Sequence, residues 1–362
     1  VLMTIGLILI GASVFLFNDS LGMGIAAGIS ISLNTLVPAL FPFMVLSSLI
    51  AYSRFSHYIS APFSRGVRWL FHLPSYCAAV ILMSMLGGYP VGAKLITDLV
   101  SNKLLTQKQA ERMLCFCVNA SPAFVVTGVG AAMFGSIQAG FLLLGAHVAA
   151  TIVTGILFRP KKADCVNAEM TPKYMSLSSA FVTAVQASAR ALVSICAFVT
   201  LFAGISAVLR SSGAMKVLSQ LISGLLFLPV SSGDAIVAGF LEVTTGCVKA
   251  ANLQGVQGLI LASLFCSWCS LSIICQIMSI VRGSGIGLKP FLLSRVVHSI
   301  FSCSFTFLLF LVFPPVTTVL TEATIAQLHL SSTPLSSGLL FITCSVLILF
   351  CEKSMASRRQ KC

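Results

Sequence analysis

Leu86-Gly-Gly-Tyr-Pro-Val-Gly-Ala-Lys94 and Phe240-Leu-Glu-Val-Thr-Thr-Gly246 are polar, turn-forming stretches that interrupt two membrane-length apolar segments, residues 75–101 and 221–250. The two interruptions occupy corresponding positions in the two halves of the chain. Hydrocarbon cannot satisfy free N–H and C=O groups, so broken backbone at membrane depth survives only inside protein or beside a polar cavity. Paired interruptions therefore indicate a binding site at the interface of two membrane repeats.

The composition is that of a membrane protein. Of 362 residues, 57% are hydrophobic and only 9% are charged, whereas a soluble globular protein is about 25% charged. The net charge of +13 comes from basic residues spread over short loops and not gathered on one amphipathic face. We therefore expect the lipid bilayer, and no nucleic acid, as the partner of these charges.

Thirteen cysteines occur, and most of them lie within apolar segments. Cys266-Ser-Trp-Cys269 has the spacing of a metal or redox motif, but no second Cys or His pair stands nearby to complete four ligands. Because cysteine is also a small, readily buried apolar residue, packing is favoured over metal binding or redox chemistry. We expect no metal and no bound cofactor.

The distribution of basic residues distinguishes between two membrane topologies for the apolar segments. Suppose first that residues 75–101 and 221–250 form re-entrant hairpins. Then only three of the 22 basic residues lie outside, namely Arg210, Lys216 and Lys249. All the others lie on the cytoplasmic side, with Arg295 at its boundary. Both termini are then cytoplasmic. If both segments cross the membrane, the basic residues of 159–173 move outside, against the positive-inside rule. The spans remaining in the hairpin topology are 1–17, 24–51, 112–134, 138–158, 184–209, 257–281, 290–314 and 335–351.

This topology predicts an all-α polytopic membrane protein with about eight spans plus two hairpins. One hairpin and two crossings separate span 24–51 from span 184–209, so the second half starts from the opposite face and the halves are inverted repeats. Each repeat runs helix, re-entrant hairpin, helix, helix. Asn119 precedes His147 by the same distance as Ser270 precedes His298, which supports the pairing. The predicted divisions are a peripheral helix at 1–23, repeats at 24–158 and 184–314, a cytoplasmic linker at 159–183, and a final helix with a basic tail at 315–362.

The first interruption offers backbone groups. Gly87, Gly88 and Pro90 permit a tight turn, after which a short helix would point its partly positive N-terminus at the membrane centre. Such a terminus suits an anionic or hydrogen-bond-accepting ligand. The alternative is a kink in an ordinary helix. Lys94, one turn further on, would either meet the ligand or extend to the inner surface.

The second interruption offers a carboxylate. Glu242 is an acidic residue inside a long apolar stretch. A carboxylate within the membrane indicates a functional role by default. It would bind a ligand hydroxyl or base, or carry a coupling proton, beside the hydroxyls of Thr244 and Thr245. The alternative is a structural ion pair with Lys249 or Lys94.

Polar residues also mark the helix that follows each hairpin. Asn119 and Ser121 break the first, while Ser270 and Gln276 lie on one face of the helix predicted over 257–281. Such residues also join helices in membranes, so each alone indicates packing as readily as ligand binding. His147 and His298 are either proton-relay groups or histidines satisfied at helix interfaces. No nucleophile elbow, HExxH motif or P-loop occurs, so we expect no enzyme.

Three stretches carry a family resemblance: Leu33-Asn-Thr-Leu-Val-Pro-Ala-Leu-Phe-Pro-Phe43, Gly88-Tyr-Pro-Val-Gly-Ala-Lys94 and Asn119-Ala-Ser-Pro-Ala-Phe124. They resemble the nucleoside-recognition, or Gate, domain family, in its sporulation integral membrane protein branch, the YlbJ type. The resemblance spans about residues 24–314, and the second half is distantly similar to concentrative nucleoside transporters. In those transporters the hairpin tips and the following polar helices hold the nucleoside and the coupling ion. The resemblance implies a site of Gly88, Tyr89, Asn119, Ser121, Glu242, Thr244, Ser270 and Gln276.

Two functional hypotheses follow. The first is a transporter of a small polar solute, nucleoside-like by resemblance, coupled to H+ or Na+ in the cytoplasmic membrane of a spore-forming bacterium. The second is a scaffold or assembly factor that retains the fold without transport, in which Glu242 and Lys94 are structural. A homo-oligomer or sporulation membrane partners fit either hypothesis.

Overall fold

The computed structural model describes residues 11, 15–160, 174–253 and 255–315, and every regular element in these ranges is a helix. The predicted spans 1–17 and 335–351 fall almost wholly or wholly outside these ranges. In the first half the elements are α2 (Asn18–Ile31), η1 (Ser32–Leu36), α3 (Val37–Tyr52), α4 (Phe55–Phe71), α5 (Cys77–Gly87), α6 (Tyr89–Ser101), α7 (Gln107–Cys117), η2 (Ala123–Met133) and α8 (Ile137–Leu157). In the second they are α9 (Leu177–Ser211), α10 (Ala214–Leu226), α11 (Val230–Leu241), α12 (Val243–Ala251), α13 (Val256–Trp268), α14 (Leu271–Val281) and α15 (Lys289–Val312).

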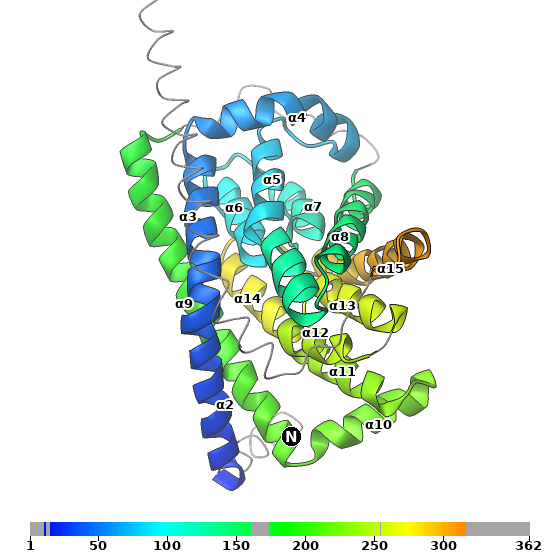
Figure 1. Cartoon of the computed structure of the whole chain (residues 1–362). Coiled ribbons are helices and arrows are strands. Elements are labelled where there is room, and N and C mark those ends of the chain that lie inside the picture. The colour runs from blue at the N-terminus through cyan, green and yellow to red at the C-terminus, as the bar shows by residue number, and fades with distance from the viewer. Residues whose placement is uncertain (1–10, 12–14, 161–173, 254, 316–362) are drawn as a thin grey trace, which may run out of the picture.

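The two halves repeat one order of elements in opposite directions. Each has a long helical run, a short helix, a pair of short helices, a broken helix and a closing helix. The run from α2 to α3 leads to α4 at one end of the molecule, whereas α9 starts at that end and leads to α10 at the other (Figure 1). The all-α fold and its membrane character are confirmed, with the repeats inverted as the charge argument predicts.

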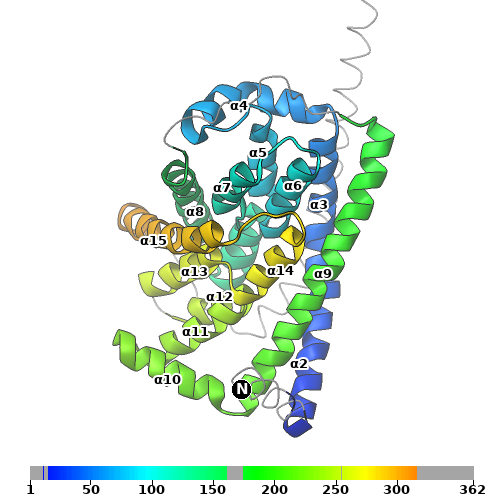
Figure 2. The same ribbon diagram turned by 180° about the vertical axis from the view of Figure 1, so that it is seen from behind.

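The two long runs pack closely through small residues. A Cβ on Gly24 would lie 2.7 Å from Ala207 Cβ, and one on Gly28 would lie 2.7 Å from Thr200 Cα. Small residues let helix backbones approach in lipid, where no hydrophobic force drives helices together. Figure 2 shows α9 against the α2–α3 run from behind.

Six of the eight predicted spans lie within the described residues, and fewer than six helices there are long and apolar enough to cross a membrane. Among the described residues, four helical segments are long and apolar enough to cross a membrane, namely α8, α9, α13 with α14, and α15, or five if the bent pair α10 and α11 forms one span. The predicted span 112–134 is instead two short helices, α7 and η2. The predicted span 24–51 is one helical run in which the π-helical turns of η1 separate α2 from α3. Apolar content alone therefore overcounts the spans, because it does not register these breaks.

Both interruptions fold the chain back on itself. Gly88 joins α5 to α6 with φ +84° and ψ −177°, a conformation that favours glycine. A Cβ on Gly92 would lie 2.9 Å from Ser84 Cβ, and one on Gly246 would lie 2.2 Å from Gly239 Cα, so the two arms of each hairpin touch. The second hairpin is shorter than the predicted window 221–250, because α10 is a separate helix that meets α11 at 114°.

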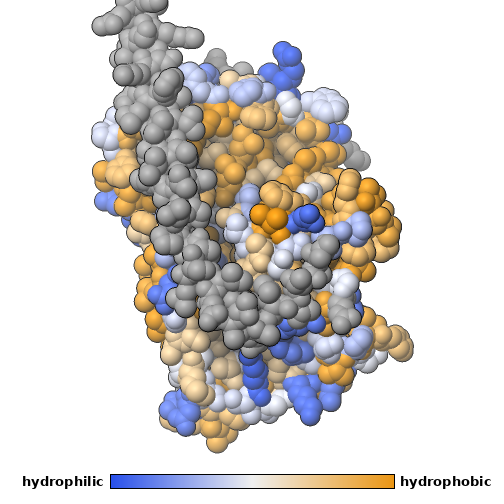
Figure 3. Space-filling view, viewed as in Figure 1, coloured by the Kyte–Doolittle hydropathy of each residue, from blue (hydrophilic) through white to orange (hydrophobic). Residues whose placement is uncertain are grey.

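The surface carries large apolar side chains suited to lipid. Leu293, Ile300, Leu308 and Leu311 of α15 are exposed. Figure 3 shows broad apolar areas on the described part of one face, with hydrophilic residues more frequent toward the α4 and α10 ends. An apolar belt between polar ends is the surface that a bilayer covers.

Candidate functional site

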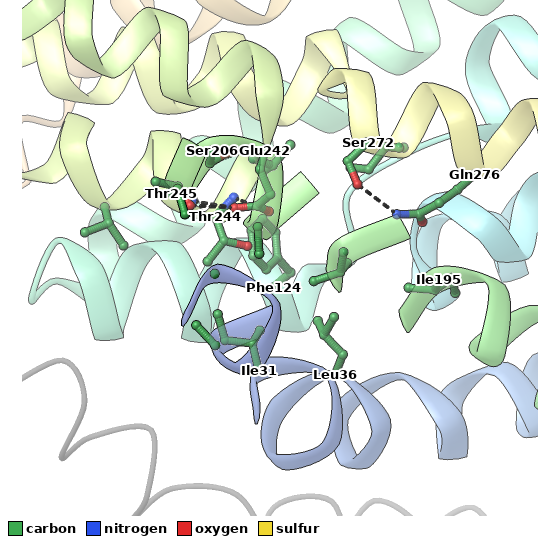
Figure 4. Close-up of a pocket in the computed structure, with 18 of the residues that line it drawn as sticks. Ile31, Leu36, Phe124, Ile195, Ser206, Glu242, Thr244, Thr245, Ser272 and Gln276 are labelled. Atoms are coloured by element: carbon green, nitrogen blue, oxygen red, sulfur yellow. Dashed lines mark hydrogen bonds between the residues drawn. The ribbon is translucent and has the colours of Figure 1, made fainter. Parts of the chain in front are cut away.

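A cavity of about 560 Å³ lies between the long helices and the two hairpins. The tips of both hairpins line it, together with the start of the second part of each broken helix and the facing sides of α2 and α9. Figure 4 shows polar Glu242, Thr244 and Thr245 at one end, and Ser272 and Gln276 further along. Apolar Ile31, Leu36 and Ile195 complete the wall. The cavity thus combines polar residues at the repeat interface with a mixed wall of the long helices, in which Ser206 and Arg210 of α9 stand among apolar side chains.

Four helices begin at this cavity: α6, η2, α12 and α14. Their first residues contribute Tyr89, Phe124, Val243 and Ser272 to the lining. A helix N-terminus carries free N–H groups and about half a positive charge. α6, η2 and α14 have no acidic residue in the first turn, and Arg210 also lines the cavity. The cavity therefore favours hydrogen-bond-accepting or anionic groups.

Glu242 neutralises the partial positive charge at the N-terminus of the fourth helix, α12. It is the N-cap of α12, and its carboxylate accepts hydrogen bonds from the backbone N–H groups of Thr244 at 2.8 Å and Thr245 at 2.7 Å. The Thr245 hydroxyl donates to it at 2.9 Å. The carboxylate is therefore held in a fixed position at the cavity wall. The carboxylate, for which the sequence left an ion pair as the alternative, is satisfied by its own helix.

Lys94 and Lys249, which the sequence left as alternative ion-pair partners of Glu242, each have a different partner. Lys94 donates to Asp98 at 2.7 Å and also to the Tyr52 hydroxyl, which itself donates to Asp98 at 2.5 Å. Lys249 pairs with Asp234 across the second hairpin. Neither lysine lines the cavity. The ion pair between Glu242 and either lysine, left open by the sequence, does not form.

Eight of the twelve predicted site residues line the cavity: Gly88, Tyr89, Pro90, Ser121, Glu242, Thr244, Thr245 and Gln276. Gly87, Lys94, Asn119 and Ser270 do not. Gly87 packs so tightly that an added Cβ would lie 2.7 Å from a Val91 methyl. Tyr89 presents its ring to the cavity while its hydroxyl donates to Cys266 O at 2.8 Å, which ties the first hairpin to the end of α13. Ser270 is the N-cap of α14 and accepts from Ile273 N.

The second broken helix differs from the sequence prediction. Residues 257–281 are not one continuous helix with a polar face, because the chain turns at Cys269, whose φ is +63°. α13 ends at Trp268 and α14 starts at Leu271. Ser272 and Gln276 still share one face, and Gln276 Nε2 donates to Ser272 Oγ at 3.4 Å. The break moves the start of α14 to the cavity.

Arg295 of α15, which the sequence placed at the cytoplasmic boundary, has a fully buried side chain. The guanidinium donates to Val118 O at 2.9 Å and to Cys115 O, the carbonyls at the end of α7. It also lies 3.6 Å from Cys269 Sγ, at the break of the other repeat. C-terminal helix carbonyls carry partial negative charge, so this fixed cation stabilises the end of α7.

Next to Arg295 lies a buried pair of histidines, His147 and His298. Its Nη1 lies 3.2 Å from His298 Nδ1, and His298 Nε2 lies 3.4 Å from the Thr151 hydroxyl. Thr151 donates to Asn119 Oδ1 at 3.0 Å, so Asn119 belongs to this network and not to the cavity. The His147 and His298 rings are 4.7 Å apart, and neither ring nitrogen of His147 has a partner among the described residues. Both histidines lie well inside their helices, α8 and α15.

The described cysteines are free. Cys266 and Cys269 are buried. In the part of the chain that the structure describes, no three His, Cys, Asp or Glu side chains are grouped so that they could hold a metal ion.

Comparison with known proteins gives one informative match. The chain is 26% identical over 311 residues to the sporulation integral membrane protein YlbJ of Bacillus subtilis (strain 168), covering 78% of this chain and 76% of that protein. No family model matches the chain. No solved structure matches it. With the membrane character of the fold, the similarity supports the placement of this chain in the YlbJ type of sporulation integral membrane proteins.

Proposed function

We propose that the protein is a transporter that moves a small polar solute across the cytoplasmic membrane during spore formation. The observation that carries the proposal is the single cavity lined by the tips of both inverted hairpins and by the polar starts of both broken helices. Inverted repeats that meet at a midplane site are the basis of alternating access. The spore-forming context comes from the similarity to YlbJ.

The solute would carry hydrogen-bond-accepting or anionic groups. Three helix N-termini without acidic residues face the cavity, and Ser121, Thr244 and Gln276 add side chains that donate and accept. A nucleoside-like molecule has such groups, and so do other small polar solutes. The fixed Glu242 carboxylate adds one strong acceptor for a donor group of the solute.

We infer a proton, in preference to Na+, as the coupling ion. Transporters often coordinate Na+ with the carbonyls at half-helix C-terminal ends, and here the guanidinium of Arg295 occupies those of α7. Uptake should persist when choline replaces Na+ and should fall when a protonophore is added. Uptake that requires Na+ would contradict this inference.

Solute uptake into proteoliposomes tests the proposal. Labelled nucleosides, nucleobases, amino acids and small acids would be screened with the purified protein, and at least one should accumulate above protein-free liposomes. Thr244→Trp places a bulky ring at the half-buried cavity wall and should reduce that uptake at least about tenfold, as expected when a site loses its fit. Val193 lies on the outer surface of α9 and is 71% exposed, so Val193→Trp is the matched control and should transport normally.

Glu242→Gln separates transport from the scaffold hypothesis, which gains some support from the finding that Glu242 is satisfied as an N-cap. The amide keeps one acceptor oxygen and loses the charge, so stability should fall by about 1 kcal/mol, as for a weakened N-cap. A folded variant with lost uptake and lost spore function supports transport. A variant with normal spore function, or an unaltered protein that moves none of the screened solutes, favours the scaffold.

A further inference from the structure

The cavity is placed unevenly between the two ends of the molecule. Along the run from α2 to α3, which ends at the α4 end, its lining residues extend from Ser20 to Leu40. Along α9, which runs the opposite way, they extend from Ile195 to the last residue, Ser211. Ser211 is exposed, whereas Ile195 is only 3% exposed. The cavity therefore reaches the α10 end of both long runs and stops short of the α4 end.

At the α4 end, hydrogen bonds join the first hairpin to the long helices. Tyr52, the last residue of α3, donates to the Asp98 carboxylate of α6 at 2.5 Å. Lys94 of α6 donates to the same carboxylate at 2.7 Å and also to the Tyr52 hydroxyl. The Tyr52 carbonyl accepts from Met175 N at 3.0 Å, just before α9 begins. The contacts of Tyr52 thus connect α3, the hairpin arm α6 and the approach to α9.

At the α10 end, the corresponding place is part of the cavity. The run from α2 to α3 and the helix α9 have the same length and opposite directions, so Ser211 occupies the place of Tyr52 in the inverted repeat. Ser211 lines the cavity and donates to Ser20 of α2 at 2.7 Å. Its bond connects the two long helices to each other and does not reach the second hairpin.

The lysine of the second hairpin also differs from that of the first. Lys249 lies on the second arm, α12, as Lys94 lies on α6, but its partner is Asp234 of the first arm, α11. The pair therefore stays within the hairpin. Among the residues that the structure describes, no hydrogen bond or ion pair joins the second hairpin to α2, α3 or α9. Of the two hairpins, the first is tied to a long helix and the second is not.

The contacts of the first hairpin are of a kind that can hold one arrangement and release it. The Lys94 and Asp98 side chains are 12% and 32% exposed, so water screens this pair less than it screens a pair on the open surface. Hydrogen bonds that involve charged groups are stronger than neutral ones. A few such bonds bias packed helices between two arrangements without fixing one of them permanently.

We propose that Tyr52, Lys94 and Asp98 form a latch that closes the cavity at the α4 end, and that this structure is the state open toward the α10 end. The basic residues assign the α4 end to the cytoplasm, so the open state faces outward. The inference rests on the proposed transport, and it names the residues that close one side. Release of the latch would free α6 from α3 and open the same cavity toward the cytoplasm.

Access to a cysteine in the cavity tests the latch without measuring transport. Leu40→Cys places a half-buried reporter on the cavity wall of α3. A small membrane-impermeant thiol reagent would be applied to one face at a time in oriented vesicles, and Asn252→Cys would identify the face at the α10 end. The reporter should label from that face. Tyr52→Phe and Asp98→Asn should each raise its labelling from the other face about fivefold, because the closed state loses a bond to a charged group.

A true change of state is reciprocal, so labelling from the α10 face should fall in the same variants. Asp234→Asn, which breaks the ion pair inside the second hairpin, is the matched control and should change neither rate. Each variant without the reporter gives the baseline for the native cysteines. Because labelling measures access and not solute movement, the latch can be confirmed even if no screened solute is transported, and it can fail even if one is.

Three results would overturn the proposal: labelling of Leu40→Cys from the α4 face in the protein with an intact latch, no change in the Tyr52→Phe variant, or an equal change in Asp234→Asn. A rise at both faces would show a loosened fold and would overturn it as well. Thermal midpoints in detergent check that the variants fold. If Asp98→Asn does not fold, Tyr52→Phe carries the test, because it removes a single hydroxyl and keeps the ring.

Discussion

At the scale of single residues, the most consequential side chain is one whose backbone acceptors are distant in sequence. Arg295 reaches backbone carbonyls in the first repeat and a thiol at the break of the second, with no carboxylate beside it. The sequence predicted it at a membrane boundary, because an arginine near the start of an apolar window usually lies there. Backbone acceptors leave no mark in a sequence, so this role could not be predicted.

Arg295→Met should strongly destabilise the protein. The substitution leaves buried carbonyls of α7 without donors, each at a cost of about 1–3 kcal/mol, and it removes the positive charge that stabilises the end of that helix. Arg295→Lys keeps the charge without the two-pronged geometry and should retain part of the stability. Thermal unfolding in detergent measures both variants. Lys289→Gln, at the exposed start of the same helix, is the control, and an Arg295→Met protein that melts with it would contradict the role.

Glycine acts at the scale of elements, where it sets how closely the first hairpin packs. A Cβ on Gly92 would lie 1.7 Å from Cys117 O, a backbone atom at the end of α7. The same close approach brings the start of α6 beside the break that follows α7. The hairpin and the broken helix are therefore positioned against each other by the absence of a side chain.

Gly92→Ala should abolish or greatly reduce folded protein, since the obstructing atom is backbone and cannot move cheaply. Gly66→Ala in α4, where nothing lies within 4 Å of the added Cβ, should be stabilising by about 0.5–1 kcal/mol. Size-exclusion profiles and thermal midpoints compare the two. A Gly92→Ala protein with the profile of the unaltered chain would show that the hairpin does not pack as described.

The sequence predicts these elements unevenly, for physical reasons. Gly88 and Pro90 are strong turn formers, so the first hairpin tip could be located from composition. The break at Cys269 could not, because cysteine has no preference for positive φ. α4 was missed because its arginines and serines interrupt the apolar pattern that identifies spans.

At the scale of the whole molecule, charge distribution was the most informative signal. It predicted that the two hairpins enter from opposite faces, and the structure places α4 and α10 at opposite ends with the repeats inverted (Figure 1). It could not give the number of spans, because an uncharged break within an apolar window leaves the distribution of basic residues unchanged. Nor could it give the cavity, whose walls come from α2 and α9 as well as from the hairpins.

The sidedness of the two hairpins is the most direct test of this architecture. Asn102 and Asn252 are exposed and occupy the same place in the two repeats, the C-cap of the second hairpin helix. Asn102→Cys and Asn252→Cys would each be exposed to a membrane-impermeant maleimide, with labelling of the unaltered protein as the baseline. The account predicts that Asn252→Cys labels in intact cells, whereas Asn102→Cys labels only after permeabilisation. Labelling of both positions from one and the same side would contradict it.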